Sequence, residues 1–202
     1  MKKILALTLC FALLAGVPVF AEKDTVEPIT AMNGFEWGAS IEDVKEGLIK
    51  NGTSESDIEI TEGGRNLFAR SQKVSSYKCS ANYYFDEAGK LYFGIYTITD
   101  KHSSENKYIE DYEKLNTVYE EVYGECSSKR EKWINDFYKN DAKHKALAVS
   151  KGDLKIISTW YGEDGSRVIH SLEGDNYKIG HFVYYVSADY YNKEQSTNTN
   201  GV

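Results

Sequence analysis

The chain has 202 residues, of which 24 are basic and 31 acidic, so its formal net charge is −7. This acidic balance argues against a nucleic-acid-binding protein, because such a protein needs a basic face. Aromatic residues make up 13% of the chain, and 16 of them are tyrosines, which argues against disorder. The length is sufficient for one domain with its own core.

The first 21 residues are typical of a secretory signal peptide. Two lysines precede an apolar run over residues 4–16, and Ala21 offers a small residue at the cleavage point. The run is too short to span a bilayer, and no later stretch is apolar for long enough. The sequence predicts a signal peptide over 1–21 and a single domain over 22–202, periplasmic or secreted. That domain would hold 22 basic and 31 acidic residues, a charge of −9.

Two cysteines remain once the signal peptide has taken Cys10 with it. Cys79 and Cys126 are an even pair in an exported protein, which is compatible with a disulfide closing a loop of about 48 residues. Two buried thiols are the alternative, and the sequence leaves both interpretations open.

A first helix is predicted directly after Ser40. Ser40 suits an N-cap, and Asp43 occupies the third helical position, where an acidic side chain can complete a capping box. The expected apolar face consists of Ile41, Val44 and Leu48. A short strand is predicted over 65–70.

The clearest strands form a hairpin over residues 77–85 and 91–98, joined by a polar turn. Apolar side chains alternate with more polar ones in both arms, which indicates half-buried strands. In the second arm the apolar set is expected at Leu91, Phe93 and Ile95. The opposite face of the hairpin is then expected to carry Asn82, Tyr84, Tyr92 and Tyr96.

A second helix ends at Gly124. Its stripe steps by four and three residues and is predicted to pack on a core; the stripe consists of Tyr108, Tyr112, Leu115, Tyr119 and Val122. Residues 129–150 are ambiguous, although Trp133, Ile134 and Phe137 have helical spacing, and residues 142–149 would continue such a helix. Three strands are predicted over 154–160, 167–172 and 177–187, followed by a polar tail over 192–202. The last strand is apolar on both faces and is therefore expected at the centre of its sheet.

These elements predict an α+β fold in which helices cover one face of an antiparallel sheet. A helix followed by about three strands occurs twice, in residues 35–100 and 105–187. The order suggests a duplicated helix-plus-three-strand unit, although the halves share no residue pattern.

A set of short motifs runs through most of residues 35–187. The first is Phe35-x-Trp37-Gly38-x-Ser40, and the second is Tyr84-Phe85-Asp86 followed by Gly89-Lys90-Leu91. Tyr123-Gly124 and Trp160 complete the set. The layout resembles that of uncharacterised exported bacterial proteins with an F-x-W-G-x-S start. Their α+β arrangement is similar to the beta-lactamase-inhibitor-protein-like fold, which small outer-membrane assembly lipoproteins also use. The resemblance implies no catalytic residue and no cofactor.

Enzyme motifs are absent from the sequence: there is no nucleophile elbow, phosphate-binding glycine loop or zinc-protease helix. His170 and His181 lie in neighbouring predicted strands, and together with Glu173 they could form a metal site in a small envelope hydrolase. Two unrelated strand histidines are the favoured interpretation, so no metal ligand is assigned.

The remaining candidate is a surface made of Asn82, Tyr84, Tyr92 and Tyr96. Tyrosine is enriched at interfaces, because it offers a large contact area at a low entropic cost. An aromatic ladder that only covers its own sheet is the alternative. The sequence favours a non-enzymatic binding or interaction module of the bacterial envelope, with a protein or another envelope component as partner, and leaves the ligand and the oligomeric state undetermined.

Overall fold

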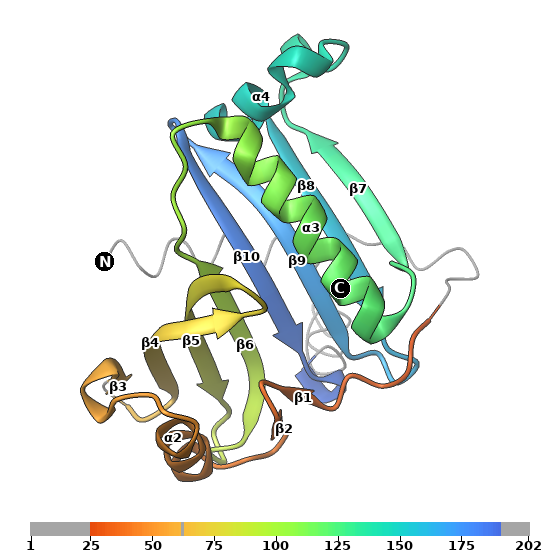
Figure 1. The fold of residues 1–202 in the computed structure, drawn as a ribbon. Helices are drawn as coiled ribbons and strands as arrows, with labels where there is room; N and C mark the ends of the chain where they lie inside the picture. The colour runs from red at the N-terminus through yellow and green to blue at the C-terminus, as the bar shows by residue number, and fades with distance from the viewer. Residues whose placement is uncertain (1–24, 62, 191–202) are drawn as a thin grey trace, which may run out of the picture.

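The computed structural model describes residues 25–61 and 63–190 (Figure 1). The predicted signal peptide (1–21) and polar tail (192–202) lie outside these residues. The fold is α+β, as predicted: one eight-stranded antiparallel sheet has helices packed against it. No helix within the described residues has the length and apolar character needed to cross a membrane.

The sheet has the last strand of the chain at its centre and the strands β3 and β7 at its edges. Its strands, in spatial order, are β3 (Ile58–Ile60), β4 (Asn66–Val74), β5 (Tyr77–Phe85), β6 (Leu91–Ile98), β10 (Lys178–Val186), β9 (Arg167–Asp175), β8 (Leu154–Tyr161) and β7 (Ser128–Trp133). The last strand, β10, lies between β6 and β9, which confirms the central position expected from its apolar side chains. A separate small ribbon, β1 (Ala31–Met32) and β2 (Phe35–Glu36), precedes the first helix.

The helices pack on one face of the sheet, here called the helix face. They are α2 (Ile41–Lys50), α3 (Glu105–Tyr123) and α4 (Lys145–Lys151), with short 3-10 turns η1 (Glu55–Asp57), η2 (Asp136–Tyr138) and η3 (Ala142–His144). The capping box at α2 is confirmed, because the Ser40 side chain accepts from the Asp43 amide and the Asp43 carboxylate accepts from the Ser40 amide. In Figure 1, α3 lies diagonally across the strands of the second half of the chain.

The core on the helix face joins both halves of the sequence. Val44 and Leu48 of α2 belong to the same buried cluster as Leu115 of α3, Trp160 of β8 and Val183 of β10. The strands β6 and β10 pair directly between the halves, from Phe182–Thr97 to Val186–Phe93. The predicted duplication stays a prediction, since strand order alone does not establish it.

In the second half, the structure resolves one ambiguous region and corrects one predicted core residue. Residues 128–133, in the region that the sequence left ambiguous, form the edge strand β7, with all six residues paired to β8. Their run of alternating charges suits an edge strand, where exposed lysines block pairing with another chain. In α3 the predicted core stripe holds at Tyr112, Leu115 and Tyr119, but Val122 is 65% exposed, and the neighbouring Tyr123 packs against the buried cluster instead.

Candidate functional site

A β-bulge in the β5–β6 hairpin decides which side chains share a face. Tyr84 pairs with Phe93, whereas the next residue, Phe85, pairs with Leu91, so Tyr92 is the extra residue. A bulge shifts the alternation of side chains by one position. Phe93 and Ile95 therefore lie on the face opposite the helices, in a cluster with Tyr84 and Tyr92.

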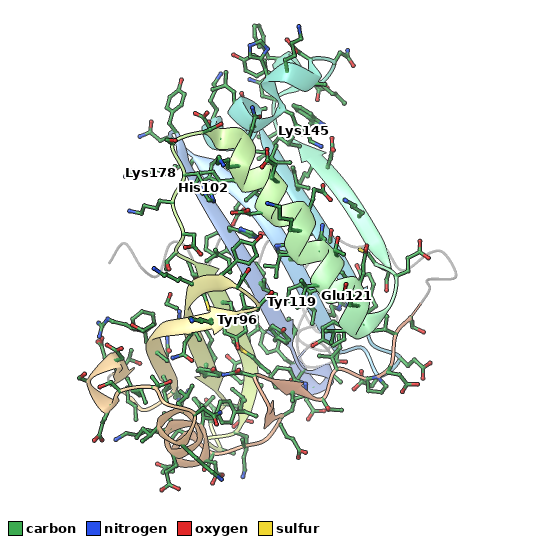
Figure 2. The ribbon with its side chains drawn as sticks, in the orientation of Figure 1. Tyr96, His102, Tyr119, Glu121, Lys145 and Lys178 are labelled. Atoms are coloured by element: carbon green, nitrogen blue, oxygen red, sulfur yellow. The ribbon has the colours of Figure 1, made fainter. Side chains whose placement is uncertain are left out.

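The same shift corrects the predicted surface at one position. Tyr96 lies on the helix face and is only 3% exposed, with its ring edge-on to Tyr185 at 6.0 Å. Figure 2 places it near Tyr119 of α3, beside the core. Burial also raises the pKa of the Tyr96 phenol far above its ordinary value. Tyr96 is a core residue, and the shared face reduces to Asn82, Tyr84 and Tyr92.

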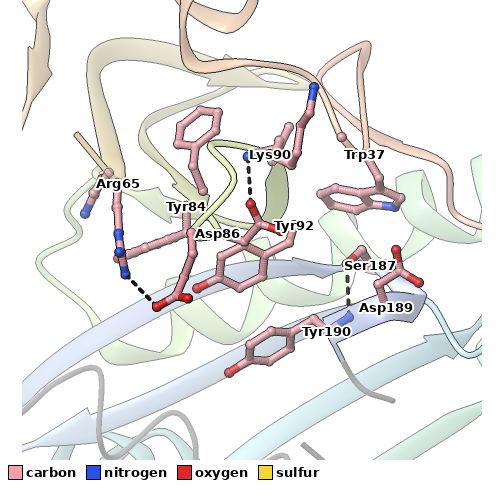
Figure 3. A pocket seen from close by; sticks show the side chains of 14 residues that line it. Trp37, Arg65, Tyr84, Asp86, Lys90, Tyr92, Ser187, Asp189 and Tyr190 are labelled. Atoms are coloured by element: carbon pink, nitrogen blue, oxygen red, sulfur yellow. Dashed lines mark hydrogen bonds and ion pairs between the residues drawn. The ribbon is translucent and has the colours of Figure 1, made fainter. Parts of the chain in front are cut away.

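Tyr84 and Tyr92 line a pocket of about 810 Å³ at the turn end of the hairpin (Figure 3). Asn82 is half-buried between Phe68 and Ile95 and does not line it. The pocket is also lined by Lys90 of the hairpin turn and, from three further segments, by Trp37, Arg65, Asp189 and Tyr190. The pocket thus joins the loop before α2, the start of β4, the hairpin turn and the chain after β10.

Aromatic rings form the wall of this pocket nearest to β10. Tyr92 and Tyr190 stack with centroids 4.9 Å apart, and Tyr84 lies against Phe93 at 5.3 Å. Such pairs fix the orientation of the rings beyond what burial alone achieves. At the rim, the indole Nε1 of Trp37 donates to the Ile29 carbonyl at 2.5 Å, which holds the ring in place.

Charged side chains of both signs surround the aromatic wall. Arg65 lies 3.6 Å from Glu87, and Asp86 accepts from the backbone amides of Ala88 and Lys90 at 2.9 Å each. The Asp86 contacts are those of a turn residue that orders the hairpin loop. Preorganised rings beside hydrogen-bonding groups are features of a binding site, and nothing in this arrangement resembles a nucleophile activated by a base.

Sequence reasoning identified Tyr84 and Tyr92 but missed Trp37, Arg65 and Tyr190. Trp37 and Gly38 form a turn before α2, and the Gly38 amide donates to the Leu91 carbonyl at 2.8 Å. That long-range hydrogen bond brings Trp37 to the pocket. An aromatic residue just beyond an apolar strand, as at Tyr190, was the available signal.

The two strand histidines do meet, but not as a metal site with Glu173. The Nε2 atoms of His170 and His181 lie 2.6 Å apart, and His170 Nδ1 lies 2.7 Å from Asn116 Oδ1. Glu173 lies on the opposite face, where it pairs with Lys155 at 2.5 Å, because odd and even positions of β9 face opposite ways. Two Nε2 atoms that hydrogen-bond each other do not present their lone pairs to a common metal. No group of three suitable metal ligands occurs within residues 25–61 and 63–190.

Burial explains the ionisation state of this pair. It lowers the pKa of His170 well below its ordinary value, with the nearby His181 as the next cause, and lowers that of His181 to about 4. Both rings are therefore neutral at pH 7. They form a hydrogen-bonded polar layer under α3, where the Tyr112 ring stacks on His170 at 4.2 Å.

The two cysteines are free thiols. Cys79 is buried on the helix face, and burial raises its pKa to about 12, which makes it a poor nucleophile. The half-buried Cys126 thiol donates to the carbonyl of Ser128 at 3.2 Å. Of the two interpretations left open by the sequence, the structure contains the pair of thiols.

Comparison with known proteins finds no family model, curated protein or solved structure that matches this chain. The resemblance to exported bacterial proteins and to the beta-lactamase-inhibitor-protein-like fold therefore stays a prediction from the motifs.

Proposed function

We propose that the protein is an exported, non-enzymatic binding module of the bacterial envelope, which captures a protein or another envelope component in the pocket lined by Tyr84 and Tyr92. The observation that carries the proposal is the convergence of five aromatic residues and several charged ones, from four separate segments, on a single pocket of about 810 Å³. Pockets of this size and mixed character are typical of ligand sites.

The geometry also favours binding over an aromatic ladder that only covers its sheet. Aromatic contacts do continue across neighbouring strands, from Tyr84 through Phe93 to Tyr184. Tyr92, however, stacks on Tyr190, which lies beyond the end of β10 and outside such a ladder. Tyrosine and tryptophan side chains in such positions often dominate binding energy, because they offer rigid area with a polar group. The metal-dependent alternative loses Glu173 and receives no support from the paired histidines.

Capture from envelope extract tests the proposal. We expect the double substitution Tyr84→Ala and Tyr92→Ala to abolish retention of a partner that the wild type retains, since each hot-spot truncation weakens binding by about thirtyfold or more. Phe68→Ala is the matched control, because Phe68 is a half-buried aromatic on the same face and lies outside the pocket.

Circular dichroism of each variant establishes that the fold persists. Equal retention by the wild type and a folded double variant would contradict the assignment of the pocket. Loss of retention in Phe68→Ala as well would show that the effect is not specific to the pocket.

A further inference from the structure

Charge is distributed unevenly along this acidic chain. Residues 132–151, here called the basic lobe, contain five lysines, two aspartates and one histidine, with no arginine and no glutamate, although the whole chain has a formal net charge of −7. The lobe comprises the end of β7, the turns η2 and η3, and helix α4, which gather at one end of the sheet (Figure 1). Its net charge of +3 therefore opposes that of the molecule.

The same end exposes large apolar side chains. Phe137 is 77% exposed and Ile134 is 59% exposed, both in the loop that follows β7. Tyr177, which is 66% exposed, lies at the same end of the sheet in the β9–β10 turn, where its amide donates to the Ser150 carbonyl of α4 at 2.9 Å. These three side chains are here called the apolar tip.

Contacts with Tyr138 order the turn that carries Phe137. The Tyr138 ring meets Phe137 edge-on at 4.8 Å, and the Lys151 ammonium lies 5.0 Å above the Tyr138 ring. The exposure of Phe137 is thus built into an ordered turn, whose first residue is capped by Asn135 accepting from the Phe137 amide.

Both aspartates of the basic lobe are paired within it, and Lys151 pairs with Asp153 at 3.4 Å just beyond it. Asp136 pairs with Lys139 at 3.2 Å, and Asp141 with His144 at 2.7 Å. Lys145 pairs with Glu131 of β7. Lys132 and Lys143 are exposed and take part in no ion pair with the described residues.

We propose that the apolar tip and the lysines of the basic lobe dock the protein on the surface of an anionic lipid bilayer. Aromatic and aliphatic tips insert at the level of the lipid headgroups, while lysines around them attract anionic lipids and extend their ammonium groups into the polar layer. The lobe contains lysines and no arginine, whereas protein interfaces are enriched in arginine and depleted in lysine. This composition favours a lipid surface over an acidic protein.

Vesicle co-sedimentation of the full chain tests the proposal. The probes are phosphatidylcholine vesicles, with and without about one third phosphatidylglycerol, at low and high salt. We expect the wild type to bind the anionic vesicles at low salt and to be released at high salt. Phe137→Ser, and separately the pair Lys132→Gln and Lys143→Gln, should each lower the partition coefficient about tenfold.

Two control variants are compared with the lobe variants. All of them contain the same N-terminal residues, so any contribution of the apolar run over 4–16 to vesicle binding is the same in each. Val122→Ser removes an equally exposed apolar side chain at the other end of α3, and Lys50→Gln with Lys73→Gln removes the same charge from α2 and β4. Both should bind as the wild type does.

The proposal is overturned if the wild type does not bind anionic vesicles, or if the lobe variants and the controls bind alike. Capture of an acidic protein through the lobe without vesicle binding would assign this surface to a protein contact instead, and would also overturn it. The Tyr84 and Tyr92 pocket lies apart from the lobe, so either result is independent of the proposed partner binding.

Discussion

His170 and His181 show how a single pair of residues can make the stability of this fold depend on pH. The contact between the two Nε2 atoms needs one donor and one acceptor, so the neutral pair is satisfied and the doubly protonated pair is not. Around it lie Tyr112 and Asn116 of α3, while the charges that affect its ionisation are Asp111, His102 and Lys129. Adding a proton places a charge in a buried layer, which is costly.

We therefore expect the free energy of unfolding to fall as the pH is lowered from about 6.5 towards 4. Both pKa values are lower in the folded protein, so the unfolded chain binds more protons in this window and acid favours unfolding. The slope should reach up to about 1.4 kcal/mol per pH unit for each histidine. Urea titrations between pH 7 and pH 5, above the range of most carboxylates, measure it.

His181→Gln provides the comparison, because it removes one of the two titrating rings. The variant should show a shallower slope than the wild type over the same pH range. An unchanged slope in His181→Gln would contradict the assignment.

At the residue scale, the candidate site was only partly predictable. Tyr84 and Tyr92 follow from alternation along the hairpin, but Tyr96 was misplaced because one extra residue, Tyr92, reverses the alternation after it. A bulge is determined by strand pairing and leaves little trace in a single sequence. Trp37 and Tyr190 come from loops, whose positions depend on contacts distant in the chain.

At the level of elements, helix α2 illustrates how local signals determine a boundary. The Ser40 hydroxyl oxygen accepts from the Asp43 amide at 3.1 Å, and both groups are exposed, so the interaction contributes to the helix without affecting the core. These signals lie within four residues, which is why the start of the helix was predicted correctly.

Ser40→Ala should therefore lower the free energy of unfolding by about 1 kcal/mol, as is usual for the loss of an N-cap. Ser40→Asp should restore most of this loss, since aspartate is an equally good N-cap. Chemical denaturation measures both variants. A Ser40→Ala variant as stable as the wild type would show that α2 is held by its core contacts at Val44 and Leu48 alone.

The edge strand β7 lies in the region that the sequence left ambiguous. Trp133, Ile134 and Phe137 have helical spacing, yet Trp133 ends a strand that pairs residue for residue with β8. Ile134 and Phe137 then form an exposed turn instead of a buried helical face. The spacing of these three residues does not distinguish a buried helical face from an exposed apolar tip, because the same sequence pattern is compatible with both.

For the whole molecule, strand β10 separates the two proposed surfaces. Lys178 begins it near the basic lobe, and Val186 ends it near the pocket, about 26 Å away at the usual rise per residue. A protein docked on a bilayer through the lobe would hold the pocket away from the lipid, where it could meet a partner. The sheet can act as such a spacer only if both halves of the chain form one rigid unit.

The substitution Leu48→Ala tests whether the two halves of the chain unfold as one unit. Leu48 of α2 is fully buried in the cluster that also contains Trp160 and Val183, and β6 pairs with β10 across the halves. The substitution should cost about 2–5 kcal/mol. If unfolding is cooperative, hydrogen exchange at amides of β9, which belongs to the other half of the chain, should accelerate as much as exchange in β5. Faster exchange in β5 with unchanged protection in β9 would show that the halves unfold separately, and that the sheet is not a rigid spacer.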